Sequence, residues 1–520
     1  MAEHQITRRT LLASSVAVAV AAVAGLDLAS IRVKAAGNKV VRVRGDVDIQ
    51  VLDPGYMVGG MEIPVDYATL PRLAIAKKNG DQWSWEPAPY VDKLEQTDPT
   101  HIAFTLKPGM MWSKGFGEVT ADDVKYSYER ILKSDWKDSW SSLDHVDVTD
   151  KYSGVIVLNK PFAPVWLLSL TTGVGSVVSK AAVEKMADKK FTTELPAECG
   201  PYSMTQWVPK QKLILTRNAD WKGPQPDADE VQIIMIEDSN AAELAYQANE
   251  VDLTQIAISS YNRYKNQLPE KSKLLVLPGP FFQWMGMNTD NPKLKDVRVR
   301  KAIQRAIDVD SILQAAYGGV APKSYGIVTP GVVGYREAAS YSYKPDEAKA
   351  LLAQAGVSNL ELELKMENTQ ERQTEAQIIQ ANLADVGIKL TITPLDSGPF
   401  WNLGQESKGD AWKTLELWLM EYRTQPDASD ALQWFTKSQV GVWNWERWSD
   451  PEFEDLWGKG LAETDPAARA KIYLRMQEIM ENTGAYVWIT HQPQIYIHRD
   501  SLEPAFDSAG YDYFNGFKVT

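Results

Sequence analysis

The chain has 520 residues, too many for one hydrophobic core, because single cores stop growing at about 250 to 300 residues. Its composition, 44% hydrophobic and 24% charged, argues against a disordered chain and predicts about two or three packed domains. With 55 basic and 68 acidic residues the formal net charge is −13, which argues against nucleic acid as a partner.

The N-terminal segment, residues 1–35, is typical of an export signal. Arg8 and Arg9 stand directly before an Ala/Val-rich run, as in twin-arginine signals. The run from Leu11 to Ala24 is short for a membrane anchor, and small residues that suit cleavage follow it. We therefore expect export by a twin-arginine-type signal and a periplasmic location.

The single cysteine, Cys199, stands beside a Gly-Pro-Tyr turn. It has no second cysteine for a disulfide, and it lies too far downstream for a lipid anchor. A metal site would need histidines close by, and the chain has only five. A nucleophile would need a base that the sequence does not place. The pattern favours a small buried side chain at the entry to a hairpin.

Strands and helices alternate in the first half of the chain. A period of two predicts a strand from Lys39 that runs into the Asp-Pro-Gly turn at 53–55. Thr120 and Asp123 have the spacing of a capping box, which predicts a helix over 120–132. We also expect two strands joined by a Pro-Gly turn at 101–115, a hairpin at 200–221, a strand at 227–238, and a helix followed by a strand at 239–256.

The second half is typical of a wound α/β domain. A helix over 374–387 lies between strands at 361–366 and 388–395, which predicts a β-α-β unit. Asp296 is the expected cap of one helix over 296–313. The remaining expectations are a strand at 281–290, a helix at 344–356, a helix at 465–484 and strands at 485–490 and 493–499.

Motifs of catalysis and nucleotide binding are absent from the sequence. It has no phosphate loop, no G-x-S-x-G elbow, no H-E-x-x-H pair and no G-x-G-x-x-G turn, and Gly173-Val174-Gly175 lacks the third glycine. We expect no catalytic residue, no metal and no cofactor. The sequence therefore predicts a binding protein before it predicts an enzyme.

Five blocks of sequence, in order, resemble the peptide/nickel class of extracellular solute-binding proteins, family 5 of the binding proteins of ABC importers. They are a strand-turn-helix block, the Gly-Pro-Tyr hairpin, an Asn-containing strand with the following helix, a later helix, and a closing helix and strand. These blocks occupy 104–132, 198–223, 288–312, 341–356 and 472–489.

The resemblance implies an α/β protein with the type II periplasmic-binding-protein fold, in which a hinge joins two lobes and the first lobe carries an extra α/β subdomain. Lobe I would comprise 36–64, 195–278 and 487–520, with the subdomain at 65–194 and lobe II at 279–486. A small-molecule or peptide solute would be captured between the lobes and delivered to an ABC permease in the inner membrane. We expect a monomer.

The resemblance also implies a ligand contact at Glu421-Tyr422, where peptide-binding relatives carry Asp-Tyr and place the carboxylate against the peptide amino terminus. Glutamate keeps the charge and moves it by one methylene, so it could still bind an ammonium group. The alternative is that Glu421 pairs with Arg423 or another neighbour on the surface. Asp427 is a weaker candidate, because a carboxylate in a turn is often a cap.

Tryptophans are dense after Gly387, and most should lie in the core. Trp401, Trp434 and Trp443 flank loops, so we expect them to face a ligand. Tyr56 and Met57 are further candidates from their place after the first strand.

Three functions follow as hypotheses. The first is capture of a short peptide or another amine-bearing compound. The second is capture of an oligosaccharide or opine-like solute between tryptophans. The third, from another class, is an exported hydrolase that uses paired carboxylates. A nickel or haem role, known in parts of the family, has little support from so few histidines.

Overall fold

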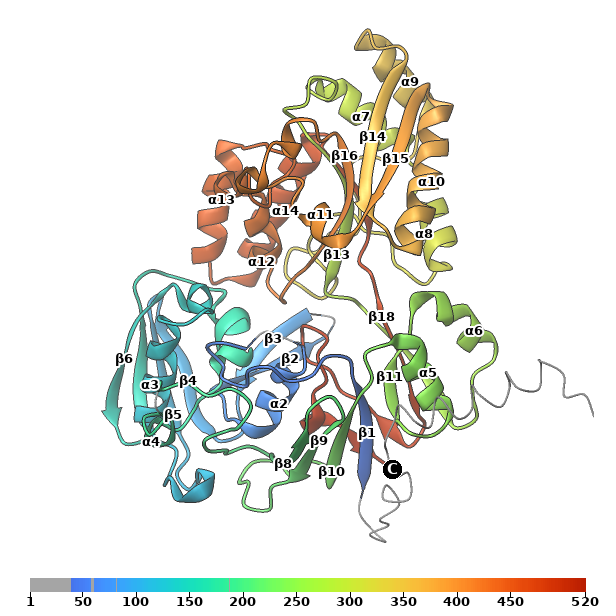
Figure 1. Ribbon diagram of the computed structural model, residues 1–520. Helices are drawn as coiled ribbons and strands as arrows, with labels where there is room; N and C mark the ends of the chain where they lie inside the picture. The colour runs from blue at the N-terminus through green and yellow to red at the C-terminus, as the bar shows by residue number, and fades with distance from the viewer. Residues whose placement is uncertain (1–38, 58–59, 81, 187) are drawn as a thin grey trace, which may run out of the picture. The chain divides into compact units, whose positions relative to one another are not determined.

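Two large sheets form the framework of the computed structural model, which describes residues 39–57, 60–80, 82–186 and 188–520 (Figure 1). The predicted export signal at 1–35 lies outside the described residues. Within them, no helix combines the length and apolar character needed to cross a bilayer. The mixed α/β class expected from the sequence is confirmed.

The first sheet has seven strands in the order β12-β18-β11-β1-β10-β9-β8. The predicted hairpin is confirmed, since β8 pairs antiparallel with β9 and Cys199 lies buried at its entry. Burial raises the pKa of the Cys199 thiol to about 12, so it is a neutral core side chain. The strands are β1 (Val40–Gly45), β8 (Tyr202–Val208), β9 (Lys212–Arg217), β10 (Glu230–Met235), β11 (Leu253–Gln255), β12 (Ser272–Leu277) and β18 (Gln494–Arg499), with helices α2 (Glu62–Thr69), α5 (Ser239–Gln247) and α6 (Tyr261–Asn266).

A four-stranded antiparallel sheet lies between β1 and β8 in the chain. It has the order β4-β5-β7-β6, and α3 (Ala121–Ile131) begins at the predicted capping box of Thr120 and Asp123. The prediction of a second strand within 101–115 is wrong. Lys114 and Gly115 have φ of 56° and 76°, so the chain turns where a strand would need extended backbone. The elements are β2 (Ala74–Asn79), β3 (Gln82–Pro87), β4 (Val91–Asp98), β5 (His101–Leu106), β6 (Leu143–Asp150), β7 (Ser153–Leu158) and α4 (Lys180–Val183).

The second large sheet has five strands in the order β15-β14-β16-β13-β17. The expected β-α-β unit is confirmed, because β14 and β15 pair in parallel and α10 (Gln370–Asp385) connects them. Its strands are β13 (Phe281–Met287), β14 (Leu360–Glu367), β15 (Ile388–Leu395), β16 (Leu417–Arg423) and β17 (Tyr486–Thr490).

One predicted helix is two in the structure. Ile307 has extended backbone between α7 (Val297–Ala306) and α8 (Val309–Tyr317), and the carboxylate of Asp308 accepts a hydrogen bond from the backbone N–H of Ser311 to cap α8. The apolar period continues through this break, so it does not reveal the cap. Asp296 caps α7 as expected.

Helices cover both faces of the five-stranded sheet (Figure 1). The apolar side chains of β16 alternate between two cores, with Leu417 and Leu419 in one and Trp418, Met420 and Tyr422 in the other. The first core faces α7 (Val297–Ala306), α8 (Val309–Tyr317), α9 (Pro345–Gln354) and α10 (Gln370–Asp385), and the second faces α11 (Ser397–Trp401), α12 (Ala428–Leu432), α13 (Pro451–Ala462) and α14 (Pro466–Asn482).

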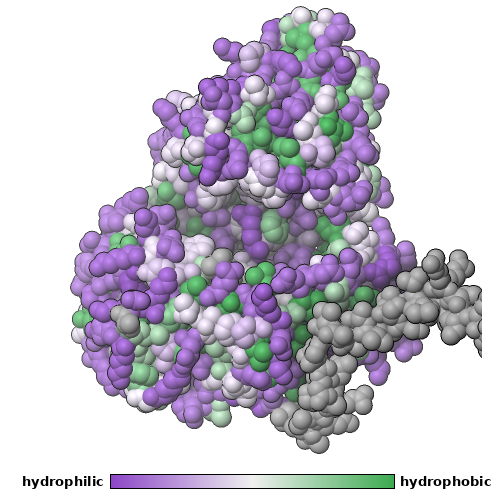
Figure 2. Space-filling model, viewed as in Figure 1, coloured by the Kyte–Doolittle hydropathy of each residue, from purple (hydrophilic) through white to green (hydrophobic). Residues whose placement is uncertain are grey.

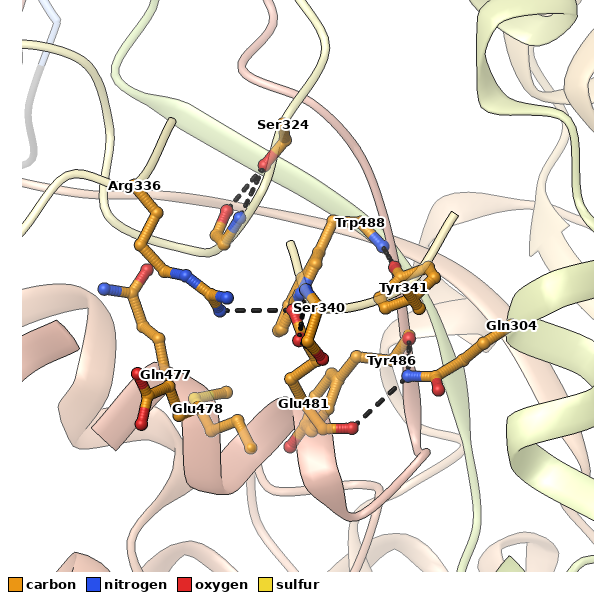
Figure 3. Close-up of polar contacts among 12 residues, drawn as sticks. Gln304, Ser324, Arg336, Ser340, Tyr341, Gln477, Glu478, Glu481, Tyr486 and Trp488 are labelled. Carbon is orange, nitrogen blue, oxygen red and sulfur yellow. Dashed lines mark hydrogen bonds and ion pairs between the residues drawn. The ribbon is translucent and has the colours of Figure 1, made fainter. Parts of the chain in front are cut away.

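The irregular segment between α8 and α9 is held by α14 and β17 (Figure 3). Glu481 of α14 accepts a hydrogen bond of 2.7 Å from the backbone N–H of Ser340 and forms a 3.2 Å ion pair with Arg336. The Tyr341 hydroxyl accepts a 2.9 Å hydrogen bond from the backbone N–H of Trp488. These contacts supply the polar partners that a loop buried without strand pairing requires.

The chain crosses between the two large sheets twice, from β12 to β13 and from β17 to β18. The two crossings pack together at Gly279, where an added Cβ would lie 1.5 Å from the carbonyl oxygen of Gln492. Residues 487–490, expected in lobe I, pair with β13 in the five-stranded sheet, so the second crossing begins after Thr490. The other predicted lobe limits remain a prediction.

Substitution Gly279→Ala tests this contact between the crossings. Because the methyl group would overlap the Gln492 carbonyl, we expect a loss of unfolding free energy of about 1–3 kcal/mol, measured by urea denaturation. Gly458→Ala is the control, since Gly458 lies in α13 with open space around it, and we expect it to gain stability. Equal stability of the wild type and Gly279→Ala would contradict the packing.

Candidate functional site

Glu421 lies near the C-terminal end of β16 and forms an ion pair with a buried arginine. Its Oε2 lies 2.7 Å from Nη2 of Arg372, whose side chain is 9% exposed, whereas the Glu421 side chain is 28% exposed. Arg372 is in the first turn of α10, where the Thr369 hydroxyl caps the helix by accepting from the Arg372 backbone N–H. The alternative partner considered from the sequence, Arg423, is not the one that Glu421 contacts.

Arg372 faces a second carboxylate, that of the fully buried Glu375 one turn along α10. The two side chains lie 3.0 Å apart, and Glu375 also accepts hydrogen bonds from Gln283, at 2.6 Å, and from the hydroxyl of Tyr317, at 2.5 Å. Burial by itself would lower the pKa of Arg372, but Glu375, Tyr317 and Glu421 outweigh it and hold that pKa well above its usual value. Arg372 is therefore a permanent cation.

The formal charges of this group do not cancel. One guanidinium serves two carboxylates, which leaves an excess of one negative charge, and only Glu421 of the three is substantially open to water. Burial of an unbalanced charge is costly unless an opposite charge arrives. The arrangement can therefore accept an ammonium or guanidinium group at Glu421 through a charge-assisted hydrogen bond.

The predicted tryptophans gather around Tyr422. Trp401, Trp434 and Trp443 are half-buried, and their ring centroids lie 6.1, 6.2 and 6.2 Å from the Tyr422 ring. The Tyr422 hydroxyl donates a 3.0 Å hydrogen bond to the carbonyl of Trp443, which fixes the cluster to the loop after α12. Other tryptophans of this region, Trp418, Trp445 and Trp448, are buried in the core, as expected for most of them.

Glu421 and this aromatic cluster lie on opposite faces of β16. Tyr422 belongs to the core under α11 to α14, whereas Glu421 contacts α10 on the other face. The structure therefore brings the three tryptophans together but does not bring them to the Glu421 carboxylate.

Asp427 has a role inside lobe II. It is buried, it caps α12, and both its oxygens pair with the guanidinium of Arg469 at 2.9 and 3.0 Å. With these partners its carboxylate is satisfied within the protein, and its contact with a solute stays a prediction.

Tyr56 and Met57 lie in the other lobe, between β1 and α2. The ammonium of Lys190 stands 3.6 Å over the Tyr56 ring, and the Met57 carbonyl accepts a 2.7 Å hydrogen bond from the indole of Trp136. Both residues thus have neighbours of their own within the protein. Their contact with a solute remains a prediction.

Sequence reasoning missed the residues that hold Glu421. Arg372 and Glu375 are three residues apart on a helix, which in sequence cannot be told from an exposed ion pair. Among the described residues no group of three or more histidine, cysteine or acidic side chains is placed to hold a metal ion.

The sequence and the structure both match known proteins. Residues 84–444 match the family model for the bacterial extracellular solute-binding proteins, family 5 middle region. The probable D,D-dipeptide-binding periplasmic protein DdpA of Escherichia coli is 25% identical over 458 residues, 85% of this chain and 86% of that protein. The periplasmic oligopeptide-binding protein OppA of Escherichia coli is 23% identical, over 92% of this chain and 90% of that protein.

The solved structure of HbpA2 from Haemophilus parasuis superposes with a TM-score of 0.81 and 23% identity, covering 93% of this chain and all of that one. This likeness confirms the expected fold of two lobes with the type II arrangement. Together with the match over most of the chain, it shows that the protein belongs to the bacterial extracellular solute-binding proteins, family 5.

Proposed function

We propose that the protein is a periplasmic solute-binding protein of an ABC importer and that it captures a short peptide or another amine-bearing compound for a membrane permease. The observation that carries this proposal is the excess negative charge of the Arg372, Glu375 and Glu421 group, which is open to water at Glu421. The dipeptide- and oligopeptide-binding relatives support the same class of solute.

A free amine would bind where Glu421 presents its second oxygen. Arg372 holds one oxygen, so the carboxylate has a fixed direction before the solute arrives. Such a preorganised acceptor loses little conformational freedom on binding. Export by the twin-arginine-type signal at 1–35 and action as a monomer belong to the same proposal.

Substitution Glu421→Gln tests the amine contact, because it removes the charge and keeps the size. We expect calorimetry to show that the wild type binds Ala-Ala at least about tenfold more tightly than N-acetyl-Ala-Ala, and that Glu421→Gln and Glu421→Ala lose this difference. Glu361→Gln, at an exposed pair with Lys389, is the matched control and keeps it. Equal binding of both peptides by the wild type would refute the contact.

Capture without turnover is part of the proposal, against the alternative of a carboxylate-dependent hydrolase. We expect Ala-Ala to be recovered intact by mass spectrometry after prolonged incubation with excess protein. Release of alanine at a rate that follows protein concentration would show catalysis and contradict capture.

A second candidate solute is an oligosaccharide, which the half-buried ring cluster of Trp401, Trp434 and Trp443 favours. Flat aromatic faces suit sugar rings. On our leading proposal maltotriose leaves the tryptophan fluorescence unchanged. Saturable quenching by maltotriose but not by Ala-Ala, removed by Trp443→Ala, would establish the sugar instead.

A further inference from the structure

A charged cavity of about 140 Å³ is lined by residues of the seven-stranded sheet, by Gln494 directly after the second crossing, and by Arg423 of β16 in the five-stranded sheet. Its volume is several times the roughly 30 Å³ that a water molecule takes in the liquid, so it has room for a small polar group. Figure 2 shows this face hollowed between the two sheets, with much of the visible wall hydrophilic. The polar lining comprises Arg44, Asp46, Thr254, Gln255, Arg423, Gln494, Tyr496, Tyr511 and Asp512.

The two arginines of the cavity are largely occupied by the protein. Arg44 donates from Nε to the carbonyl of Ile236 at 2.8 Å and from Nη2 to the carbonyl of Glu237 at 2.6 Å. Arg423 donates from Nη2 to the carbonyl of Ala509 at 2.7 Å and lies over the Tyr511 ring at 4.3 Å. The Nε of Arg423 is buried and has no hydrogen-bond partner in the described protein.

The acceptors of the cavity are the groups that lack partners. Gln494 is 7% exposed, and its Oε1 has no hydrogen-bond partner within the described chain. Asp512 is half-buried, and its carboxylate lies near those of Asp46 and Asp507, which cannot donate a hydrogen bond to it. A buried acceptor without a donor is rare in folded proteins, because losing water without compensation is costly. The buried oxygen of Gln494 therefore favours a donor from outside the chain, and Asp512 lines the same cavity.

The charged groups in and around the cavity also favour binding of a cation. Asp46 and Asp512 line the cavity with Arg44 and Arg423, and Asp507 lies near Asp512 and Arg423 behind this lining, so these five groups together carry an excess of one negative charge. Burial first, and then Asp46 and Asp507, raise the pKa of Asp512 to about 7. Other titratable groups nearby are Glu62 of α2, whose pKa burial raises, Asp238 and Glu243 near Arg44, the Tyr67 hydroxyl that donates to Asp507, and the neutral phenols of Tyr496 and Tyr511.

We propose that this cavity is a subsite for a guanidinium or ammonium group at the end of a solute side chain, bound by Asp512 and Gln494, so that the protein selects basic peptides. The inference rests on the proposed function and adds the class of peptide to it. Arg423 follows Glu421 by two residues, so their Cα atoms lie about 7 Å apart on the same face of β16. A peptide whose amine meets Glu421 can therefore reach the cavity with its next side chain.

The test compares L-alanyl-L-arginine with L-alanyl-L-citrulline, which has nearly the same shape without the charge, by calorimetry on the wild type. We expect the arginine peptide to bind at least about tenfold more tightly. Equal affinities would overturn the subsite and leave the proposed function standing. Binding of neither peptide, nor of Ala-Ala, would overturn both proposals.

Substitution Asp512→Asn assigns the effect to the cavity. We expect it to abolish the preference for arginine over citrulline, whereas Asp144→Asn, which removes an exposed carboxylate on β6, keeps the preference. Circular dichroism of both variants controls for folding. A preference that survives in folded Asp512→Asn would overturn the assignment.

The pH dependence gives a second readout that needs no variant. The cation binds the ionised form of Asp512, and this form is lost as the pH falls through about 7. We expect the preference for arginine to grow between pH 5.5 and about 7.5. A preference that is constant over this interval would contradict the role of Asp512.

Discussion

One buried guanidinium placed between two carboxylates is the interaction on which the site depends. Arg372 has one positive charge and cannot neutralise both Glu375 and Glu421. Glu375 is buried and accepts hydrogen bonds from Gln283 and Tyr317, whereas Glu421 is open to water. The ion pair with Arg372 fixes the direction of the open carboxylate. A solute with a positive charge completes the balance, which a neutral solute does not, and this is a physical basis for selecting amines.

The end of β16 presents two different chemistries because successive side chains of a strand point to opposite faces. Glu421 and Arg423 share the face of α10 and the cavity, whereas Tyr422 anchors the tryptophan cluster on the other face. Charge recognition and aromatic contact are therefore separate surfaces. The aromatic cluster need not take part in binding the amine, and each surface can be changed without the other.

The paired crossings connect binding to the relation between the lobes. Gly279 lies against the Gln492 backbone, and the neighbouring His491 is buried between Ser324 and the Phe281 carbonyl, where burial lowers its pKa to about 4 and keeps it neutral. Gln494, with its unpartnered oxygen, begins the strand directly after the second crossing. A donor bound in the cavity would thus contact the segment that joins the two sheets as well as Arg423.

The sequence by itself determined the elements whose cause is local. The hairpin after Cys199, the capping box at Thr120 and the β-α-β unit all follow from periodicity, caps and turn residues within a few positions of each other. It also drew attention to Glu421 and to the three tryptophans around Tyr422. It did not predict the helix break before Asp308 or the turn at Lys114. A side-chain cap at Asp308 and a left-handed backbone conformation at Lys114 both leave the pattern of apolar residues unchanged. Only the tertiary structure decided that Glu421 pairs with Arg372 and that Asp427 pairs with Arg469. It also decided that Gln494, Asp512 and Arg423 line one cavity. Such contacts join residues far apart in the chain. The energy of an interaction between charges also depends on how deeply they are buried, and a local sequence pattern does not show burial.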